Sequence, residues 1–217
     1  VRGWLALRKP AQGSGTGLSI AGDRWRNYTF DFEAVIRRNP DYVGGIGWIF
    51  RAQDERNGYV GRITLDNRLA LYRRIRGVDQ QIADTRLPIF IRDGEEHQIR
   101  TVAQDDTLIV YVDGVLVDLI RDTTYSAGRV GFSQREEEWA LVRQVRVRSS
   151  DGTLLLSDAF DEGLDRWQFA RSTPFVADGA QRDRLPWLGD LHWAGQNAYY
   201  AYDHHPFMKG SIQIFAR

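Results

Sequence analysis

The stretch LIVYVDGVLVDL, residues 108–119, carries the clearest secondary-structure signal in this chain. Asp113 and Gly114 form a two-residue turn signal, and strong β-forming residues stand on both sides of it. Asp-Gly readily adopts the positive φ angles of a tight hairpin turn, whose twist matches that of the flanking strands. The stretch therefore predicts an antiparallel β-hairpin.

Most of the first 160 residues continue this pattern. In residues 28–36, aromatic and aliphatic side chains alternate strictly with Thr29, Asp31 and Glu33, which predicts a half-buried antiparallel strand. Further short β-rich segments follow, most of them separated by turn residues: GIGWIFRA, NGYVGRI, RLALYRRI, EHQIRTVA, TLIVYV, VLVDLI, GRVGFS and WALVRQVRV. No helical period appears before about residue 186. This series predicts a mainly β protein, either a β-sandwich or a jelly roll.

Charge and composition give little support to several classes of partner. The 217-residue chain has 29 Lys and Arg against 29 Asp and Glu, so its formal net charge is zero. Nucleic-acid and membrane-surface binding usually show as a basic excess, and no apolar run approaches the ~18 residues of a membrane span. We therefore expect no nucleic-acid and no membrane partner. The absence of Cys excludes disulfides and thiolate chemistry, and both a bacterial cytoplasmic and a secreted location are compatible.

Three segments resemble a known fold. FRAQDERNGYVGRI (50–63), RLALYRR (68–74) and LIVYVDGVLV (108–117) are similar to the concanavalin A-like, laminin-G-like sandwich, over roughly residues 1–160. DAFDEGLDRW (158–167) resembles a phrase of bacterial sugar-degrading enzymes, in which a final strand passes into a linker. The resemblance implies an antiparallel β-sandwich, a fold that hosts lectins, glycosidases and adhesion modules.

The C-terminal part of the chain changes to a helical pattern after Pro174. Asp190 can cap a helix through LHWAGQNAYYAY, and Pro206 suits the first turn of another helix that runs to Arg217. Two helices of this length cannot bury their apolar faces alone. We therefore predict a sandwich over residues 1–170, followed at 171–217 by a linker and the first helices of another domain. Their exposed apolar faces would favour self-association through the C-terminal helices.

The segment DGAQRDRLPWLGDLHW, residues 178–193, gathers charged and aromatic residues. Asp178 and Asp183 lie on either side of Arg182, and carboxylates paired with Arg can hold sugar hydroxyls through charge-assisted hydrogen bonds. Trp187 offers an apolar face to a sugar ring, and a desolvated carboxylate could serve as a general acid. An equally weighted alternative is a charged surface loop in which Asp190 only caps a helix.

This segment also resembles a catalytic family. DGAQRDRLPWLGDLHWAGQNAYY (178–200) is similar to the segment that opens the catalytic (α/α)6 barrel of α-L-rhamnosidases, glycoside hydrolase family 78, typically D-G-x-x-R-D/E-R-L-x-W-x-G-D. The resemblance implies that Asp183 is the general acid that protonates the leaving oxygen. It also implies that the rhamnose pocket is formed in part by Asp178, Arg182, Trp187 and Asp190. The chain departs from the pattern in having Asp at the acid position and Pro186 where Gly is frequent.

The resemblance implies hydrolysis, with inversion, of terminal α-L-rhamnose from a rhamnose-containing glycan or glycoside. Inversion requires a second carboxylate about 6.5–9.5 Å from the acid. In the family this base lies far downstream, so we expect this chain, which stops at Arg217, to carry the acid without the base. Two other functions stay open, namely a non-catalytic carbohydrate-binding module and a plain interaction module.

Metal and cofactor sites have weaker signals. His192, His204 and His205 with Asp203 fit no standard ligand spacing, so we assign no metal site there. We expect no cofactor, with a structural calcium ion as the alternative. Its candidate ligands are loop oxygens, for which solvated turns are the favoured interpretation: Asp54, Asn57, Asp105 and Asp106.

Two further features concern the surface of the predicted sandwich. The charged run REEEWALV, residues 135–142, is expected to be a solvated edge. Four aromatic residues on or beside predicted strands would form a sugar-binding platform if they faced a concave sheet, although core packing is their commoner role: Trp48, Tyr59, Tyr72 and Trp139.

Overall fold

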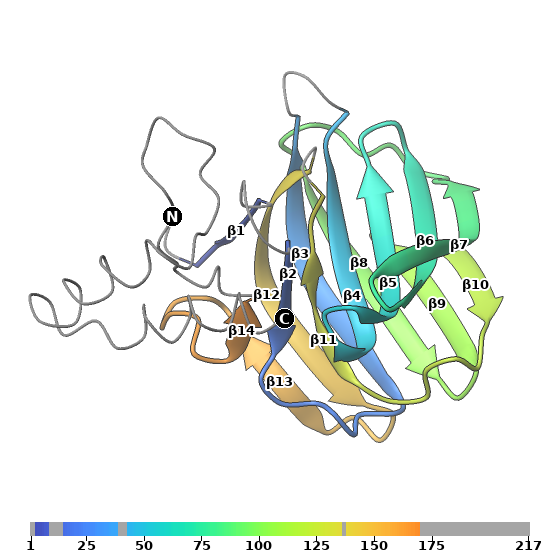
Figure 1. Cartoon of the computed structure of the whole chain (residues 1–217). Coiled ribbons are helices and arrows are strands. Elements are labelled where there is room, and N and C mark those ends of the chain that lie inside the picture. Colours follow the sequence, from blue (N-terminus) through green and yellow to red (C-terminus); the bar gives the residue numbers. More distant parts are fainter. Residues whose placement is uncertain (1–2, 9–14, 39–42, 136–137, 170–217) are drawn as a thin grey trace, which may run out of the picture. The chain divides into compact units, whose positions relative to one another are not determined.

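The computed structural model of the chain describes residues 3–8, 15–38, 43–135 and 138–169 (Figure 1). These residues form fourteen β-strands, and the described part of the chain holds no helix. Accordingly, no segment within these ranges is a helix long and apolar enough to cross a membrane. The predicted linker and helices at 171–217 lie outside the described residues.

The strands form two sheets, and every pairing within them is antiparallel. Sheet A contains, in spatial order, β1 (Leu5–Arg8), β12 (Trp139–Ser149), β3 (Tyr28–Arg37), β8 (Glu96–Gln104), β9 (Thr107–Val112) and β10 (Val115–Arg121), and β13 (Leu154–Asp158) pairs with β12. Sheet B contains β14 (Trp167–Phe169), β2 (Thr16–Ser19), β11 (Arg129–Ser133), β4 (Gly45–Asp54), β5 (Asn57–Thr64), β6 (Arg68–Ile75) and β7 (Val78–Arg86). The chain is therefore a mainly β antiparallel sandwich, as predicted.

The two local patterns that led to this prediction are both confirmed. In the hairpin between β9 and β10, Val112 pairs with Val115. Asp113 has φ 50° and Gly114 has φ 77°, the positive values that the tight turn requires. In β3, buried and half-buried residues alternate from residue 28 to residue 33, because one face of the strand points into the core.

Aromatic side chains fill the space between the two sheets. Phe32 of sheet A packs against Trp48 and Phe132 of sheet B, with ring centroids 5.8 and 5.2 Å away, and all three are essentially inaccessible to solvent. The Trp48 indole nitrogen donates a hydrogen bond of 2.9 Å to the Thr101 hydroxyl of β8. Trp48, the largest core side chain, therefore packs its apolar surface against the opposite sheet and also has a hydrogen-bond partner there.

One end of the sandwich is held by a buried guanidinium. Arg51 is fully buried at the end of β4, and it donates hydrogen bonds to the backbone carbonyls of Arg26, Asp105 and Tyr125. These carbonyls belong to three different connections between strands. Burial is the main cause that lowers the pKa of Arg51. A single side chain thus adds hydrogen bonds to all three connections, which two backbone hydrogen bonds, from Gly128 to Trp25 and from Asp122 to Asp106, also join.

We expect Trp48→Ala to lower the free energy of unfolding by about 3–5 kcal/mol, because the change leaves a large cavity and removes the partner of Thr101. Urea denaturation of the full chain measures this loss. Phe90→Ala is the matched control, since Phe90 is 71% exposed and its removal should change stability by less than about 0.5 kcal/mol. Equal losses in the two variants would contradict this description of the core.

Candidate functional site

The strand register of sheet B places two rows of side chains on the face turned away from the core, which we call the outer face of sheet B. The first row is Leu18, Gly131, Ile49, Val60, Tyr72 and Gln81. The second row is Thr16, Ser133, Gly47, Arg62, Ala70 and Asp84. Because neighbouring strands lie about 4.8 Å apart, each row is a continuous stripe of neighbours across the sheet.

The apolar part of the first row is buried although it lies outside the core. Leu18, Ile49 and Val60 form a small cluster of their own. Arg74, two residues beyond Tyr72 on β6, donates a 2.9 Å hydrogen bond to the Ser133 hydroxyl in the second row, so its side chain crosses the first row. Long Arg side chains cover apolar surface with their methylene groups while the charged end bonds to polar partners. The outer face of sheet B therefore carries a buried polar layer.

The centre of this layer is an ion pair between Arg62 of β5 and Glu138, which lies just before β12. One guanidinium nitrogen of Arg62 is 2.7 and 2.6 Å from the two carboxylate oxygens, and the side chains are only 4% and 2% exposed. Gly47 makes room for the pair, since a Cβ atom there would lie 2.7 Å from an Arg62 nitrogen and 2.0 Å from the Ser133 carbonyl oxygen. Glycine is thus required at position 47 by close approach.

Asp79 of β7 is the second anionic centre of the layer. Arg74 donates to both of its oxygens at 2.6 and 3.1 Å, Arg135 approaches to 3.5 Å, and Arg62 lies 4.0 Å away. Burial alone would raise the pKa of Asp79, but the Arg74 hydrogen bonds and the charges of the three guanidinium groups outweigh it, so the pKa is lowered. Asp79 therefore stays ionised at neutral pH and holds the three arginines in place.

Tyr72 is the aromatic residue of this face. It is half-buried in the middle of β6, and the Arg135 guanidinium lies over its ring at 5.1 Å from the centroid. A cation at this distance is attracted by the negative face of the ring. The Tyr72 ring is therefore held in place by Arg135, whose backbone N–H bonds to Glu138 of the buried ion pair.

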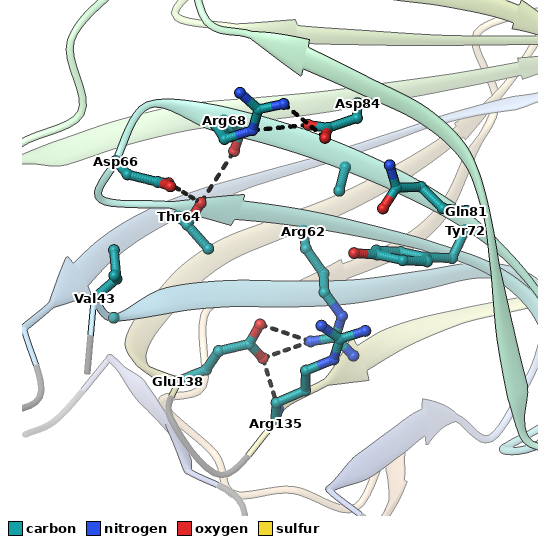
Figure 2. A pocket seen from close by; sticks show the side chains of 12 residues that line it. Val43, Arg62, Thr64, Asp66, Arg68, Tyr72, Gln81, Asp84, Arg135 and Glu138 are labelled. Atoms are coloured by element: carbon teal, nitrogen blue, oxygen red, sulfur yellow. Dashed lines mark hydrogen bonds and ion pairs between the residues drawn. The ribbon is translucent and has the colours of Figure 1, made fainter. Parts of the chain in front are cut away.

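These residues border a hollow of about 490 Å³ on the outer face of sheet B (Figure 2). Its lining residues are Val43, Gly44, Arg62, Thr64, Asp66, Arg68, Ala70, Tyr72, Gln81, Asp84, Arg135 and Glu138. The register places Ala70 between Arg62 and Asp84, so a small side chain forms the floor between two polar walls. The volume lies within the ~300–1,000 Å³ range of small-molecule sites. We call this hollow the sheet B pocket.

The wall opposite the Arg62–Glu138 pair is made by a second ion pair. Arg68 and Asp84 approach to 2.6 Å, and both side chains are partly exposed. Beside them the Thr64 hydroxyl donates a hydrogen bond to Asp66, and Figure 2 shows both pairs at the rim of the hollow. Donors and acceptors thus alternate around the sheet B pocket.

Two buried donors in this region have no hydrogen-bond partner. They are the Arg62 Nε and the Gln134 side-chain nitrogen, which are among five such atoms in the described residues. Gln134 accepts a hydrogen bond from the Gly47 backbone nitrogen through its oxygen, so its nitrogen is left over. Both atoms are inaccessible to solvent and Gln134 does not line the pocket, so the groups that a ligand can reach are those of the lining residues. The arrangement can therefore bind a compact molecule with several oxygens.

The residues predicted as the catalytic and sugar-binding cluster of the tail lie outside the described residues. They are Asp178, Arg182, Asp183, Trp187 and Asp190. The same holds for the histidine-rich segment at 192–205. Of the calcium candidates, Asp54 and Asn57 bond to each other in the turn between β4 and β5, whereas Asp105 and Asp106 lie in the turn between β8 and β9. Within the described ranges, no group of three or more His, Cys, Asp or Glu could hold a metal ion.

The four aromatic residues proposed as a sugar platform separate in the structure. Tyr72 lines the sheet B pocket, as the platform interpretation requires. Trp48 and Tyr59 are buried in the core between the sheets. Trp139 begins β12 in sheet A, where the Arg37 guanidinium lies 5.8 Å from its ring centroid.

The prediction of a solvated edge at 135–142 is wrong for Glu138, the last acidic residue of the run, whereas the Arg135 side chain is partly exposed. Glu138 is 4% exposed and bonds to Arg62, and its carboxylate also accepts the backbone N–H of Arg135 at 2.6 Å. Sequence reasoning missed both Arg62 and Glu138 because their partners lie far away in the chain. Arg62, an outward charge in an otherwise apolar strand, was a signal that could have drawn attention to this face.

Comparisons with known proteins agree with the fold. No protein-family model matches the chain, and no curated protein matches it in sequence. Among solved structures, the carbohydrate-binding module CBM66 from Bacillus subtilis is 20% identical with a TM-score of 0.56, and the match covers 68% of this chain and 96% of that one. A structure of CB05 from A. japonicus is 14% identical with a TM-score of 0.52, covering 73% of this chain and 26% of that one. These likenesses show the fold.

We expect Glu138→Gln to lower the free energy of unfolding by about 3–5 kcal/mol, because Arg62 would keep its buried charge and lose the carboxylate that accepts both hydrogen bonds from its guanidinium nitrogen. Chemical denaturation of the full chain tests this. Asp84→Asn breaks the partly exposed pair with Arg68 and should leave stability nearly unchanged. A Glu138→Gln variant as stable as the parent would mean that the ion pair does not hold the outer face together.

Proposed function

We propose that the sandwich is a carbohydrate-binding module and that the sheet B pocket receives the sugar. The observation that carries this proposal is a hollow of sugar size in which ion pairs alternate with an aromatic ring. A sugar hydroxyl both donates and accepts hydrogen bonds, so it suits a wall where carboxylate oxygens and guanidinium nitrogens stand side by side. The similar fold of a carbohydrate-binding module lends further support.

Each wall of the pocket would have a separate task. The Arg62–Glu138 and Arg68–Asp84 pairs would bond hydroxyl groups from opposite sides of the ring. Tyr72, whose ring lies under Arg135 and packs on the Leu18–Ile49–Val60 cluster, would contact the sugar with its ring edge and hydroxyl group. Because the ion pairs and Gly47 already hold these groups in position, binding would require little ordering of the protein.

Glycan-array screening of the full chain, followed by calorimetric titration of the glycans that bind, tests this proposal. We expect Tyr72→Ala to weaken binding about tenfold or more, because contact with an aromatic side chain contributes in the range of ~1–2 kcal/mol and the change also releases Arg135. Tyr111→Ala is the matched control, since Tyr111 is also a half-buried tyrosine in mid-strand but stands on the outer face of sheet A. Failure of the chain to bind any glycan, or equal losses in both variants, would refute the proposal.

We propose as a second function that the chain belongs to an α-L-rhamnosidase, with the sandwich, residues 1–170, as its accessory domain. Residues 171–217 would then form the linker and the first helices of the catalytic domain. The observation in its favour is the segment 178–200, whose similarity to the family is described above. In this proposal Asp183 is the general acid and Asp178, Arg182, Trp187 and Asp190 contact rhamnose, without a cofactor. Self-association through the C-terminal helices belongs to the same proposal.

Hydrolysis of an aryl α-L-rhamnoside by the protein at its full natural length tests this second function. We expect turnover that falls by at least about a hundredfold in Asp183→Asn, because general-acid catalysis typically contributes 10²–10⁴-fold. Asp161→Asn, an exposed Asp of the sandwich, is the control and should turn over normally. A parent protein that leaves the rhamnoside intact, or an Asp183→Asn variant with full activity, would rule the proposal out.

A further inference from the structure

We propose that the sheet B pocket selects neutral sugars and discriminates against acidic ones such as uronic acids. This inference rests on the proposed carbohydrate-binding function and names the chemical class of its ligand. It follows from the way in which the charged side chains around the pocket are paired.

The charges that line the pocket are balanced. Its lining contains three arginines, Arg62, Arg68 and Arg135, and three carboxylates, Asp66, Asp84 and Glu138. Behind them Asp79 and Arg74 add one charge of each sign. The described residues of the pocket therefore present an overall neutral surface to a ligand.

Each lining arginine is also engaged by a carboxylate of the protein. Arg62 lies 2.6 Å from Glu138, Arg68 lies 2.6 Å from Asp84, and Arg135 lies 3.5 Å from Asp79. Proteins that recognise a carboxylate usually offer it a guanidinium with a free bidentate edge. A uronate in this pocket would have to displace a protein carboxylate, and it would meet the remaining carboxylates at close range.

A neutral sugar meets none of these obstacles. Its hydroxyl groups can donate to the carboxylate and accept from the guanidinium of the same ion pair, so the pair need not be broken. The Thr64 hydroxyl and the Gln81 amide, which also line the pocket, offer further uncharged groups that both donate and accept. The pocket is therefore matched to a ligand that carries donors and acceptors in equal measure.

The Arg68–Asp84 pair, which forms the more exposed wall of the pocket, keeps one positive and one negative charge at neutral pH. The hydrogen bond from Arg68 is the main cause that lowers the pKa of Asp84, so this carboxylate is ionised throughout the neutral range. Both side chains of this pair are partly exposed, at 47% and 36%. Removal of the Asp84 charge would therefore leave Arg68 as an accessible cation at the rim without disturbing the buried layer.

The test compares matched neutral and acidic sugars on the full chain at pH 7 and low salt. The probes are immobilised pairs that differ only at C6, namely glucose with glucuronate, galactose with galacturonate and mannose with mannuronate. We expect the parent protein to bind the neutral member of its preferred pair at least about tenfold more tightly. In Asp84→Asn we expect this preference to fall to about threefold or less, because Arg68 becomes free to pair with the uronate.

Asp31→Asn is the matched control for this experiment. It makes the same change in net charge and releases Arg100 in the same way, but on the outer face of sheet A. Its neutral-to-acidic preference should equal that of the parent. A parent that binds the uronate as tightly as the neutral sugar, or an Asp84→Asn variant with an unchanged preference, would overturn the inference while carbohydrate binding itself stands. A parent that binds no member of either class would overturn both.

Discussion

The buried ion pair between Arg62 and Glu138 is the interaction on which the outer face of sheet B depends. Both charges are almost completely removed from water, so neither is tolerable without the other. Gly47 leaves the space that the guanidinium occupies, and Glu138 in turn anchors the backbone of Arg135. The pair thus connects strand β5 to the segment before β12 and defines one wall of the sheet B pocket.

The pair has this importance because the middle of sheet B, strands β4 and β5, is buried on both faces. In β4 and β5 nearly every residue is buried, with the aromatic core on one side and the polar layer on the other. A polar layer of this kind must satisfy its own hydrogen bonds, which Asp79 and Ser133 do for Arg74. The result is a surface whose polar groups are held in position before any ligand binds.

Prediction from the sequence succeeded where one face of a strand is apolar and the other polar. The alternation of apolar and polar residues was sufficient to predict strand β3, and the Asp113–Gly114 turn was sufficient to predict the hairpin of β9 and β10. Strand β7, VDQQIADTR, was not predicted, because it is an edge strand with few apolar residues and most of its surface is exposed. Trp48 and Tyr59 could not be assigned to a face, because β4 and β5 are buried on both faces and do not show which side points to the core. In β6, by contrast, Tyr72 alternates with the buried Leu69 and Leu71, so it stands on the opposite face.

The sequence by itself determined the mainly β class, the antiparallel hairpin and the presence of enough aromatic residues to fill the core. These features depend on neighbouring residues, whose turn preference and period-two pattern are visible in the chain. The tertiary structure alone decided which charges meet. Arg62 and Glu138 stand 76 positions apart. They become neighbours because only β4 separates β5 from β11 in sheet B, and Glu138 lies in the connection from β11 to β12. A one-residue change in the register of β5 would turn Arg62 to the opposite face, and local sequence does not encode that alignment.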